Sequence, residues 1–168
     1  MEHDIDIRTL ERIFAEYAAD RKNFPFYTSG LESAKIIYRV IFENTKDNLM
    51  IVLDQQDLDI ISHDKTLLNL LNKLSANAKI QILLNNAIIE PGNKLFEIAR
   101  GNENLEIREN TSGNLYDLVI ADNSMTRIES NPDKLGAFVN FNDIKFIDEF
   151  LSRFKTAHGS SRALALTP

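Results

Sequence analysis

Two short, uninterrupted apolar runs constrain the fold more than any other feature of the sequence. Residues 48–53 read NLMIVL and residues 79–84 read KIQILL, and polar residues bound both runs. Such runs are typical of strands that are buried on both faces, as in a parallel sheet covered by helices. The intervening residues 65–76 carry leucines at helical spacing. The order strand, helix, strand therefore predicts an α/β domain with parallel central strands.

The same patterns extend this prediction to the whole chain. An amphipathic helix is expected at residues 5–21, a second at 31–44 behind a capping box at 29–32, and a closing helix at 142–156. Further strands are expected at 105–108, 117–121, 125–129 and 136–141, of which the second and third form a hairpin. We predict a mixed, mostly parallel sheet with helices on both faces. Residues 1–158 form one domain, in which 1–22 hold the N-terminal helix, and residues 159–168 are a flexible tail.

The charge balance limits the classes of partner. The formal net charge is −6, which opposes attraction to phosphate backbones and anionic membranes. Cysteine is absent, so disulfides and thiol chemistry are excluded. The N-terminus lacks the pattern of a signal peptide, and no apolar run approaches the roughly 20 residues of a membrane span. We therefore expect a cytoplasmic protein that binds neither membranes nor nucleic acid.

Several segments resemble one lobe of the phospholipase D superfamily. Residues 91–110 (PGNKLFEIARGNENLEIREN) are similar to an uncharacterised bacterial group of phospholipase-D-like domains, in which a Gly-His-x-Leu element and a short helix precede a strand reading Ile-x-Ile-Arg. Here those positions are Gly92-Asn93-Lys94-Leu95 and Leu105-Glu106-Ile107-Arg108. The segment YDLVIAD, the hairpin and the closing helix follow in the same order. The resemblance covers residues 26–165 and implies the fold of a single phospholipase D lobe.

The resemblance also implies where catalytic residues would lie. The superfamily uses His-x-Lys-x4-Asp, in which the histidine attacks phosphorus and the lysine binds phosphate oxygens. With the aspartate aligned on Asp122, the histidine position holds Leu115 and the lysine position holds Asp117. Of a downstream Gly-Ser pair, Ser130 is retained and Glu129 replaces the glycine. Leucine cannot act as a nucleophile and aspartate repels phosphate, so we predict a degenerate site without phosphodiesterase activity.

Polar side chains that follow the two apolar strands form the remaining candidate site. Ligands bind open α/β sheets beyond the carboxyl ends of the parallel strands. The loop expected at residues 54–64 brings Asp54, Asp57, Asp59 and His63 to that edge, where carboxylates and imidazole suit a divalent cation. The alternative interpretation is an acidic surface loop. The next loop adds donors for a small phosphorylated ligand, or plain turn residues, at Asn85, Asn86, Asn93 and Lys94.

Three functions remain open on these residues. The favoured hypothesis is a non-catalytic phospholipase-D-like domain with a binding or assembly role and no cofactor. Single-lobe members of that superfamily pair about a two-fold axis, so the resemblance implies a homodimer, and the N-terminal helix is a candidate surface for a protein partner. The alternative is a metal-dependent or phosphate-ligand-dependent enzyme that uses residues 54–64. A receiver-like signalling domain phosphorylated at Asp54 ranks last, because no early strand ends in paired acids.

Overall fold

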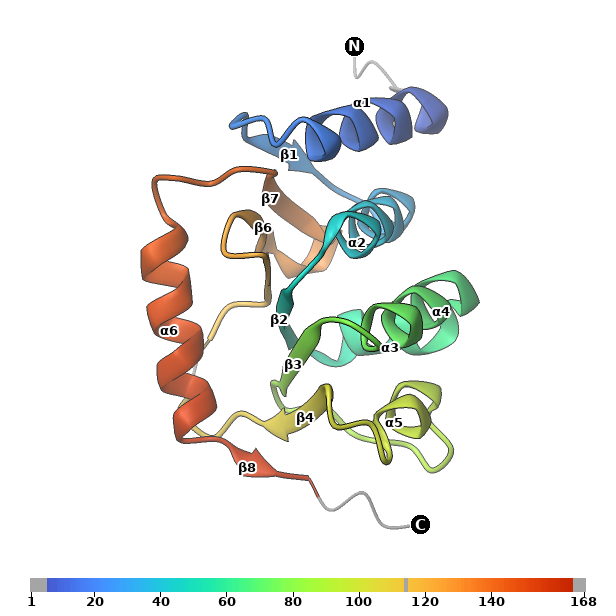
Figure 1. Cartoon of the computed structure of the whole chain (residues 1–168), viewed down its shortest axis with the longest axis vertical. Coiled ribbons are helices and arrows are strands. Elements are labelled where there is room, and N and C mark those ends of the chain that lie inside the picture. The colour runs from blue at the N-terminus through green and yellow to red at the C-terminus, as the bar shows by residue number, and fades with distance from the viewer. Residues whose placement is uncertain (1–5, 114, 165–168) are drawn as a thin grey trace.

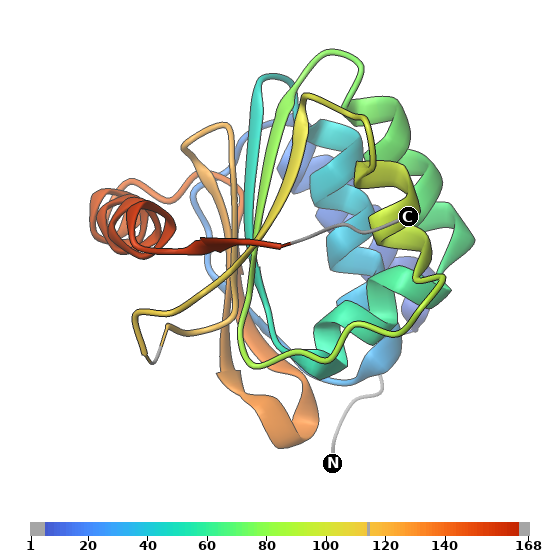
Figure 2. The same cartoon turned by 90° about the horizontal axis from the view of Figure 1, so that it is seen from below.

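A single mixed sheet forms the centre of the molecule, with helices on both faces (Figure 1; Figure 2). The computed structural model describes residues 6–113 and 115–164. Within them the strands lie in the order β1-β7-β6-β5-β2-β3-β4-β8. Their bounds are β1 (Phe26–Thr28), β2 (Asn48–Leu53), β3 (Lys79–Leu84), β4 (Leu105–Glu109), β5 (Leu118–Ala121), β6 (Met125–Asn131), β7 (Gly136–Asn140) and β8 (Arg162–Ala163). The predicted α/β fold with a mixed sheet is confirmed.

Parallel pairing is confined to the centre of this sheet. Strands β2 and β3 pair in parallel, as do β3 and β4. The other five pairings in the described residues are antiparallel. We expected parallel pairing to predominate, but the hairpin of β5 and β6 continues into β7 and β1 as an antiparallel series. Short connections force the antiparallel pairing of β5 with β6 and of β6 with β7, because a parallel pair needs a crossover of a dozen residues or more.

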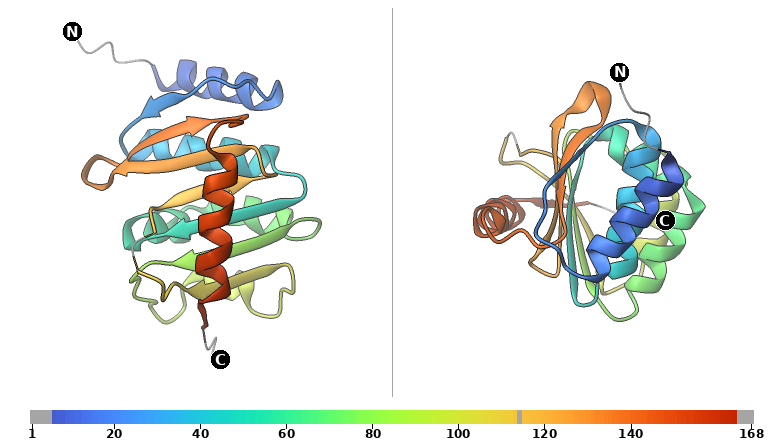
Figure 3. Two further views of the ribbon diagram at one scale, coloured as in Figure 1. Left: turned by 90° about the vertical axis from the view of Figure 1, so that its left-hand side faces the viewer. Right: turned by 90° about the horizontal axis from the view of Figure 1, so that it is seen from above.

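Within the described residues, five α-helices cover one face of the sheet and one covers the other (Figure 2; Figure 3). The first group comprises α1 (Ile7–Ala19), α2 (Leu31–Asn44), α3 (Gln55–His63), α4 (Lys65–Leu74) and α5 (Lys94–Ala99), and α6 (Ile147–Gly159) crosses the opposite face alone. The side chains of β2 alternate between two apolar cores: Leu49, Ile51 and Leu53 pack toward the five helices, and Met50 and Val52 pack toward α6. None of the helices in the described residues has the length and apolar character to cross a membrane.

The segment expected to be a loop at residues 54–64 is helix α3. The Asp54 side chain caps this helix by accepting a hydrogen bond from the Asp57 backbone N–H (2.9 Å). Leu58 and Ile61 then face the core at helical spacing, where both are fully buried. The prediction of a loop was wrong because acidic residues were interpreted as solvent-exposed when two of them cap or enter the protein interior.

Two predicted helix starts also differ from the structure. Helix α2 begins after Gly30, which has a φ of 91°, and no side chain caps it, so the capping box at residues 29–32 is not formed. Helix α6 begins at Ile147 rather than after Asn142. The reason is Asp143, whose carboxylate accepts hydrogen bonds from the Lys145 and Phe146 backbones and fixes a turn there.

The two ends of the chain differ in how well the patterns predicted them. Residues 162–163 form β8 at the edge of the sheet, where Arg108 of β4 donates hydrogen bonds to Ser161. The predicted flexible tail thus contains a strand, and its residues 165–168 lie outside the described residues. The N-terminal helix is confirmed as α1, while residues 1–5 also lie outside them.

Candidate functional site

Strand geometry brings three acidic residues together at the carboxyl end of β2. Asp54 follows β2 directly, and Asp117 directly precedes β5. Because β2 and β5 are antiparallel, with Val52 opposite Leu118, the end of one strand lies beside the start of the other. The neighbouring β6 adds Glu129, whose backbone N–H donates to the Asp117 carbonyl (3.0 Å). Residues far apart in sequence therefore form one cluster.

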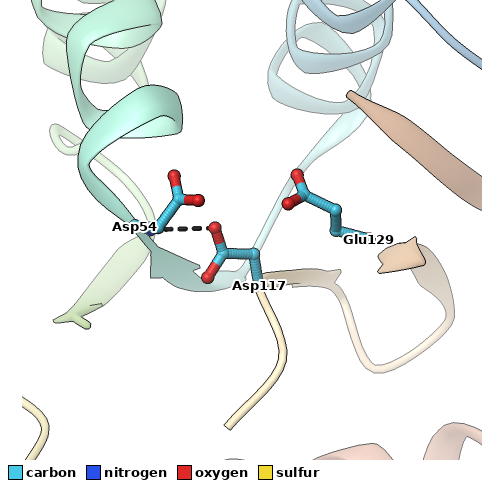
Figure 4. Close-up of side chains that lie close together, drawn as sticks. All are labelled: Asp54, Asp117 and Glu129. Carbon is cyan, nitrogen blue, oxygen red and sulfur yellow. Dashed lines mark hydrogen bonds between the residues drawn. The ribbon is translucent and has the colours of Figure 1, made fainter. Parts of the chain in front are cut away.

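The three carboxylates converge on a common point (Figure 4). One oxygen of each lies within 4.8 Å of an oxygen of the other two. The Asp117 carboxylate is held in place from both sides, because it accepts hydrogen bonds from the Asp54 backbone N–H (2.9 Å) and from the Asn85 side chain (3.3 Å). Asp117 and Glu129 are buried, and Asp54 is partly exposed, so solvent reaches the cluster from the Asp54 side.

A buried arginine lies behind this cluster. The Arg127 guanidinium is 1% exposed and lies 3.8 Å from the Asp57 carboxylate and 3.7 Å from Glu129. Its Nη1 atom donates to the Tyr38 hydroxyl (3.4 Å), and its charge lies over the Tyr38 ring, 5.0 Å from the centroid. Alternation along β6 places Arg127 and Glu129 on the same face of the sheet, toward α2 and α3. With Asp57 included, the carboxylate cluster therefore comprises four carboxylates around one guanidinium in the part of the chain that the structure describes.

Burial and mutual repulsion favour the neutral form of two of these acids. Burial raises the pKa of Asp117 to about 9, with a further increase from the neighbouring carboxylates of Asp54, Asp57 and Glu129. Burial and the Asp57 carboxylate likewise raise the pKa of Glu129 to about 8, although Arg127 acts in the opposite direction. Without a further cation, both side chains therefore hold a proton near neutral pH.

The positions aligned with the catalytic motif are separated in the structure. Leu115 is half-buried and packs against the core beneath α6, where it has no attacking atom to offer. Asp122 lies at the opposite end of β5 from Asp117 and accepts hydrogen bonds from the backbone N–H groups of residues 46, 47 and 48. Ser130 is exposed, and its hydroxyl is 3.5 Å from the Gly136 carbonyl. Of the aligned positions, Asp117 and Glu129, which replaces the glycine of the Gly-Ser pair, lie in the carboxylate cluster.

Asp122 therefore has a structural role. Its pKa is lowered: burial acts to raise it, but hydrogen bonds from the three backbone N–H groups and from Arg21 outweigh that effect. The ionised carboxylate binds the chain segment that leads into β2.

The candidate ligand residues are only partly brought together. Asp54 and Asp57 belong to the cluster, and Asn85 borders it by donating to Asp117 and to the Leu115 carbonyl. Asp59 and His63 are exposed along α3, where the His63 ring contacts the Asp59 carbonyl. The remaining three lie apart: Asn86 is exposed with a φ of 49°, Asn93 caps α5 through the Leu95 N–H, and Lys94 pairs with Glu97.

Arg127 and Glu129 were not predicted as site residues. Arg127 approaches Glu129, which is two residues along the same strand. The pattern of residues 125–129 (MTRIE) does contain a signal for a buried pair of charges. Charges at alternate positions of a strand in the sheet interior share one face, and that face must be buried against helices.

A surface cavity lies away from these groups. It has a volume of about 490 Å³ and lies at the outer edge of β4 beside β8. Its lining includes Lys79, Asn104, Glu106, Arg108 and Leu164. None of the predicted site residues lines this cavity, so the cavity and the carboxylate cluster are two separate candidate sites. We favour the carboxylate cluster, because buried titratable groups in close contact are typical of functional sites.

Comparison with solved structures identifies the fold. The chain resembles Nuc from Salmonella typhimurium, a phospholipase D family member, with a TM-score of 0.63 and 13% identity over 84% of this chain and 99% of that one. NucT from Helicobacter pylori gives a TM-score of 0.61 and 10% identity, covering 85% of this chain and all of its own. No family model and no curated protein matches the sequence.

A third similar structure is that of a DNA-binding protein. TrmBL2, an archaeal chromatin protein with a novel mode of DNA binding, gives a TM-score of 0.66 at 13% identity, over 94% of this chain. The chain spans 61% of the length of TrmBL2. These identities establish the fold and not the activity. The protein therefore has the phospholipase-D-like fold, in the form of a single lobe with a buried carboxylate cluster at the carboxyl end of β2.

Proposed function

We propose that this chain is a phospholipase-D-like domain with a binding or assembly role, and that it does not cleave phosphodiesters by histidine attack. The observation that carries the proposal is the environment of Asp117, the residue at the lysine position of the motif. It is buried beside Asp54 and Glu129, so an incoming phosphate meets carboxylates where the mechanism requires a cation. Leu115, at the histidine position, packs into an apolar core and has no lone pair with which to attack phosphorus.

Hydrolysis of bis(p-nitrophenyl) phosphate tests this proposal. We expect release of nitrophenol at the background rate, both for the unchanged chain and for Asp117→Asn, with a known phosphodiesterase as the positive control. The amide variant matters because it removes a negative charge without adding a nucleophile. Turnover by the unchanged chain that disappears in Asp117→Asn would overturn the proposal, since it would make the cluster catalytic.

The alternative function is an enzyme that uses residues 54–64 with a metal or a phosphorylated ligand. Within that segment, Asp54 is partly exposed and joins the cluster, whereas Asp57 is fully buried against Arg127. The local charge favours a cation over phosphate. A thermal-shift series with inorganic phosphate separates these ideas, because a ligand that binds only the native state raises the melting temperature. A rise with phosphate that Asp54→Asn abolishes would favour the alternative.

Assembly is the second half of the proposal. The resemblance to single-lobe members suggests that two copies of the chain pair. The helix considered as a partner surface is largely used within the chain, because Phe14 of α1 is fully buried and its ring meets those of Phe26 and Phe141. Arg39 of α2 also forms an ion pair with Glu11 of α1. Any partner surface on α1 is thus restricted to its outer side, where Ile7 is 43% exposed.

A further inference from the structure

Negative charge exceeds positive charge in the carboxylate cluster. Asp54, Asp57, Asp117 and Glu129 influence one another electrostatically, and among the described residues the guanidinium of Arg127 is the cation that pairs with them. Burial of several like charges is costly unless a counter-charge or a proton compensates them. Three of the four carboxylates also place an oxygen within 4.8 Å of one another (Figure 4).

Unpaired atoms provide a second and independent observation. Glu129 is 4% exposed in its side chain, and its buried Oε2 atom has no hydrogen-bond partner. Both carboxylate oxygens of the fully buried Asp57 also lack one. Arg127 cannot satisfy Glu129, because 3.7 Å is too long for a hydrogen bond. Buried polar atoms in native proteins are almost always paired. Either a proton shared between Glu129 and Asp57 or a cation from outside the polypeptide would supply the partner that these oxygens lack.

We propose that Asp54, Asp117 and Glu129 together bind a hard divalent cation of the Mg²⁺, Mn²⁺ or Ca²⁺ class. This inference rests on the proposed binding function and names its ligand class. Carboxylate oxygens are the ligands that such ions prefer. Three oxygens within 4.8 Å of one another lie about 2.8 Å or less from a common point, so small side-chain rotations bring all three to the bond lengths of about 2.1–2.5 Å that such ions need. Water completes the coordination from the partly exposed Asp54 side.

Neighbouring groups orient the ligands for this role. Each Asp117 oxygen accepts one hydrogen bond, from the Asp54 backbone or from Asn85, which leaves a second lone pair on each oxygen for an ion. Asn85 is itself fixed, because its Oδ1 atom accepts from Asn110. Such contacts behind the ligands fix their direction and tune metal affinity. The positive charge of Arg127, beside Asp57 and Glu129, offsets part of the negative charge of the four carboxylates.

Titration with Mn²⁺ after removal of metals with EDTA tests the inference, with free Mn²⁺ measured by electron paramagnetic resonance. We expect one equivalent to bind and Mg²⁺ or Ca²⁺ to compete for it. Asp117→Asn and Glu129→Gln should each weaken binding at least about tenfold, as loss of a ligand does. Both variants should fold, because an amide resembles the protonated acid that the apo site favours. The matched control is Asp59→Asn, which removes an exposed carboxylate of the same region from α3 and should bind Mn²⁺ normally.

Two outcomes would overturn the inference. One is the absence of stoichiometric binding up to millimolar Mn²⁺ by the folded chain. The other is an equal loss of affinity in Asp59→Asn, which would indicate diffuse attraction of counter-ions. The hydrolysis assay on the same samples keeps the two proposals distinct. Binding with Mn²⁺-dependent hydrolysis overturns the non-catalytic function and leaves the cation site, whereas absence of both binding and hydrolysis overturns the cation site alone.

Discussion

The Arg127 guanidinium lies 3.8 Å from the Asp57 carboxylate, and the two side chains are 1% and 0% exposed. This is a buried ion pair without a direct hydrogen bond, since the separation exceeds hydrogen-bond length. Both Asp57 oxygens and two Arg127 nitrogens lack partners. The attraction between such charges repays their desolvation only when the geometry is close and the remaining atoms are paired. The pair therefore connects β6 to α3 at a cost in stability.

The first prediction concerns this pair. Arg127→Met should lower the free energy of unfolding by about 3–5 kcal/mol, because it leaves Asp57 buried without a counter-charge. The double variant Arg127→Met with Asp57→Leu should be less destabilised than the sum of the single variants. Urea denaturation of all four proteins gives the coupling energy. Additivity within about 0.5 kcal/mol would show that the two charges do not interact.

The second prediction concerns Asp122, which holds the entry to β2. Asp122→Ala removes an acceptor from three backbone N–H groups and breaks the ion pair with Arg21. We expect a loss of about 2–3 kcal/mol, since hydrogen bonds to a charged group are among the stronger ones. Thermal denaturation measures it, with the exposed Glu103→Ala as the control. A loss no larger than that of the control would leave Asp122 without the structural role assigned here.

Patterns of apolar residues predicted the central elements well. The runs at 48–53 and 79–84 coincide with β2 and β3, because a strand covered on both faces must be apolar throughout. Helix starts were less accurate, since they depend on single side-chain contacts. Gly30 begins α2 without a cap, and Asp143 rather than Asn142 organises the turn before α6. Nothing in the local sequence shows that Asp143 accepts these hydrogen bonds in place of Asn142, or that α2 begins without a side-chain cap.

Part of the candidate site could be predicted from the sequence, and part depends on contacts between distant segments. Asp54 and Asn85 end adjacent strands, so their proximity follows from the sheet rule that places ligands at this edge. Asp117 was singled out by the motif alignment. The same alignment placed Glu129 at the glycine position of the Gly-Ser pair but did not predict its contact with Asp117, because that contact depends on β5 and β6 pairing in register beside β2. Long-range pairing of this kind is visible only in the folded chain.

The third prediction concerns nucleic acid. The structural similarity to the DNA-binding protein TrmBL2 raises the question for this chain, whereas the net charge of −6 argues against it. We expect no binding of a fluorescein-labelled DNA duplex in fluorescence anisotropy at 150 mM salt and micromolar protein. Saturable binding whose affinity falls steeply with salt would contradict this, since that dependence reports release of counter-ions from phosphates.

The fourth prediction concerns assembly. If two copies pair as the resemblance implies, light scattering after gel filtration should give twice the chain mass of 19.1 kDa at micromolar concentration. A uniform monomer at every concentration would count against the assembly role.

The final prediction concerns pH and follows from the two raised pKa values, about 9 for Asp117 and about 8 for Glu129. In the unfolded chain both groups titrate near pH 4. Between these limits the native state binds more protons than the unfolded state, so the free energy of unfolding falls as pH rises. This stabilising contribution is fully present below about pH 4 and is lost as the pH rises through 8 and 9.

We therefore expect urea denaturation in EDTA to show lower stability at pH 9 than at pH 5.5. The acids with lowered pKa values, Glu106 and Asp122, titrate below this range and do not affect the comparison. Asp117→Asn should flatten the decline, because it removes one of the two titrating groups, and Asp59→Asn should leave it unchanged. Parallel curves for the unchanged chain and Asp117→Asn would show that Asp117 is already ionised in the native protein at neutral pH.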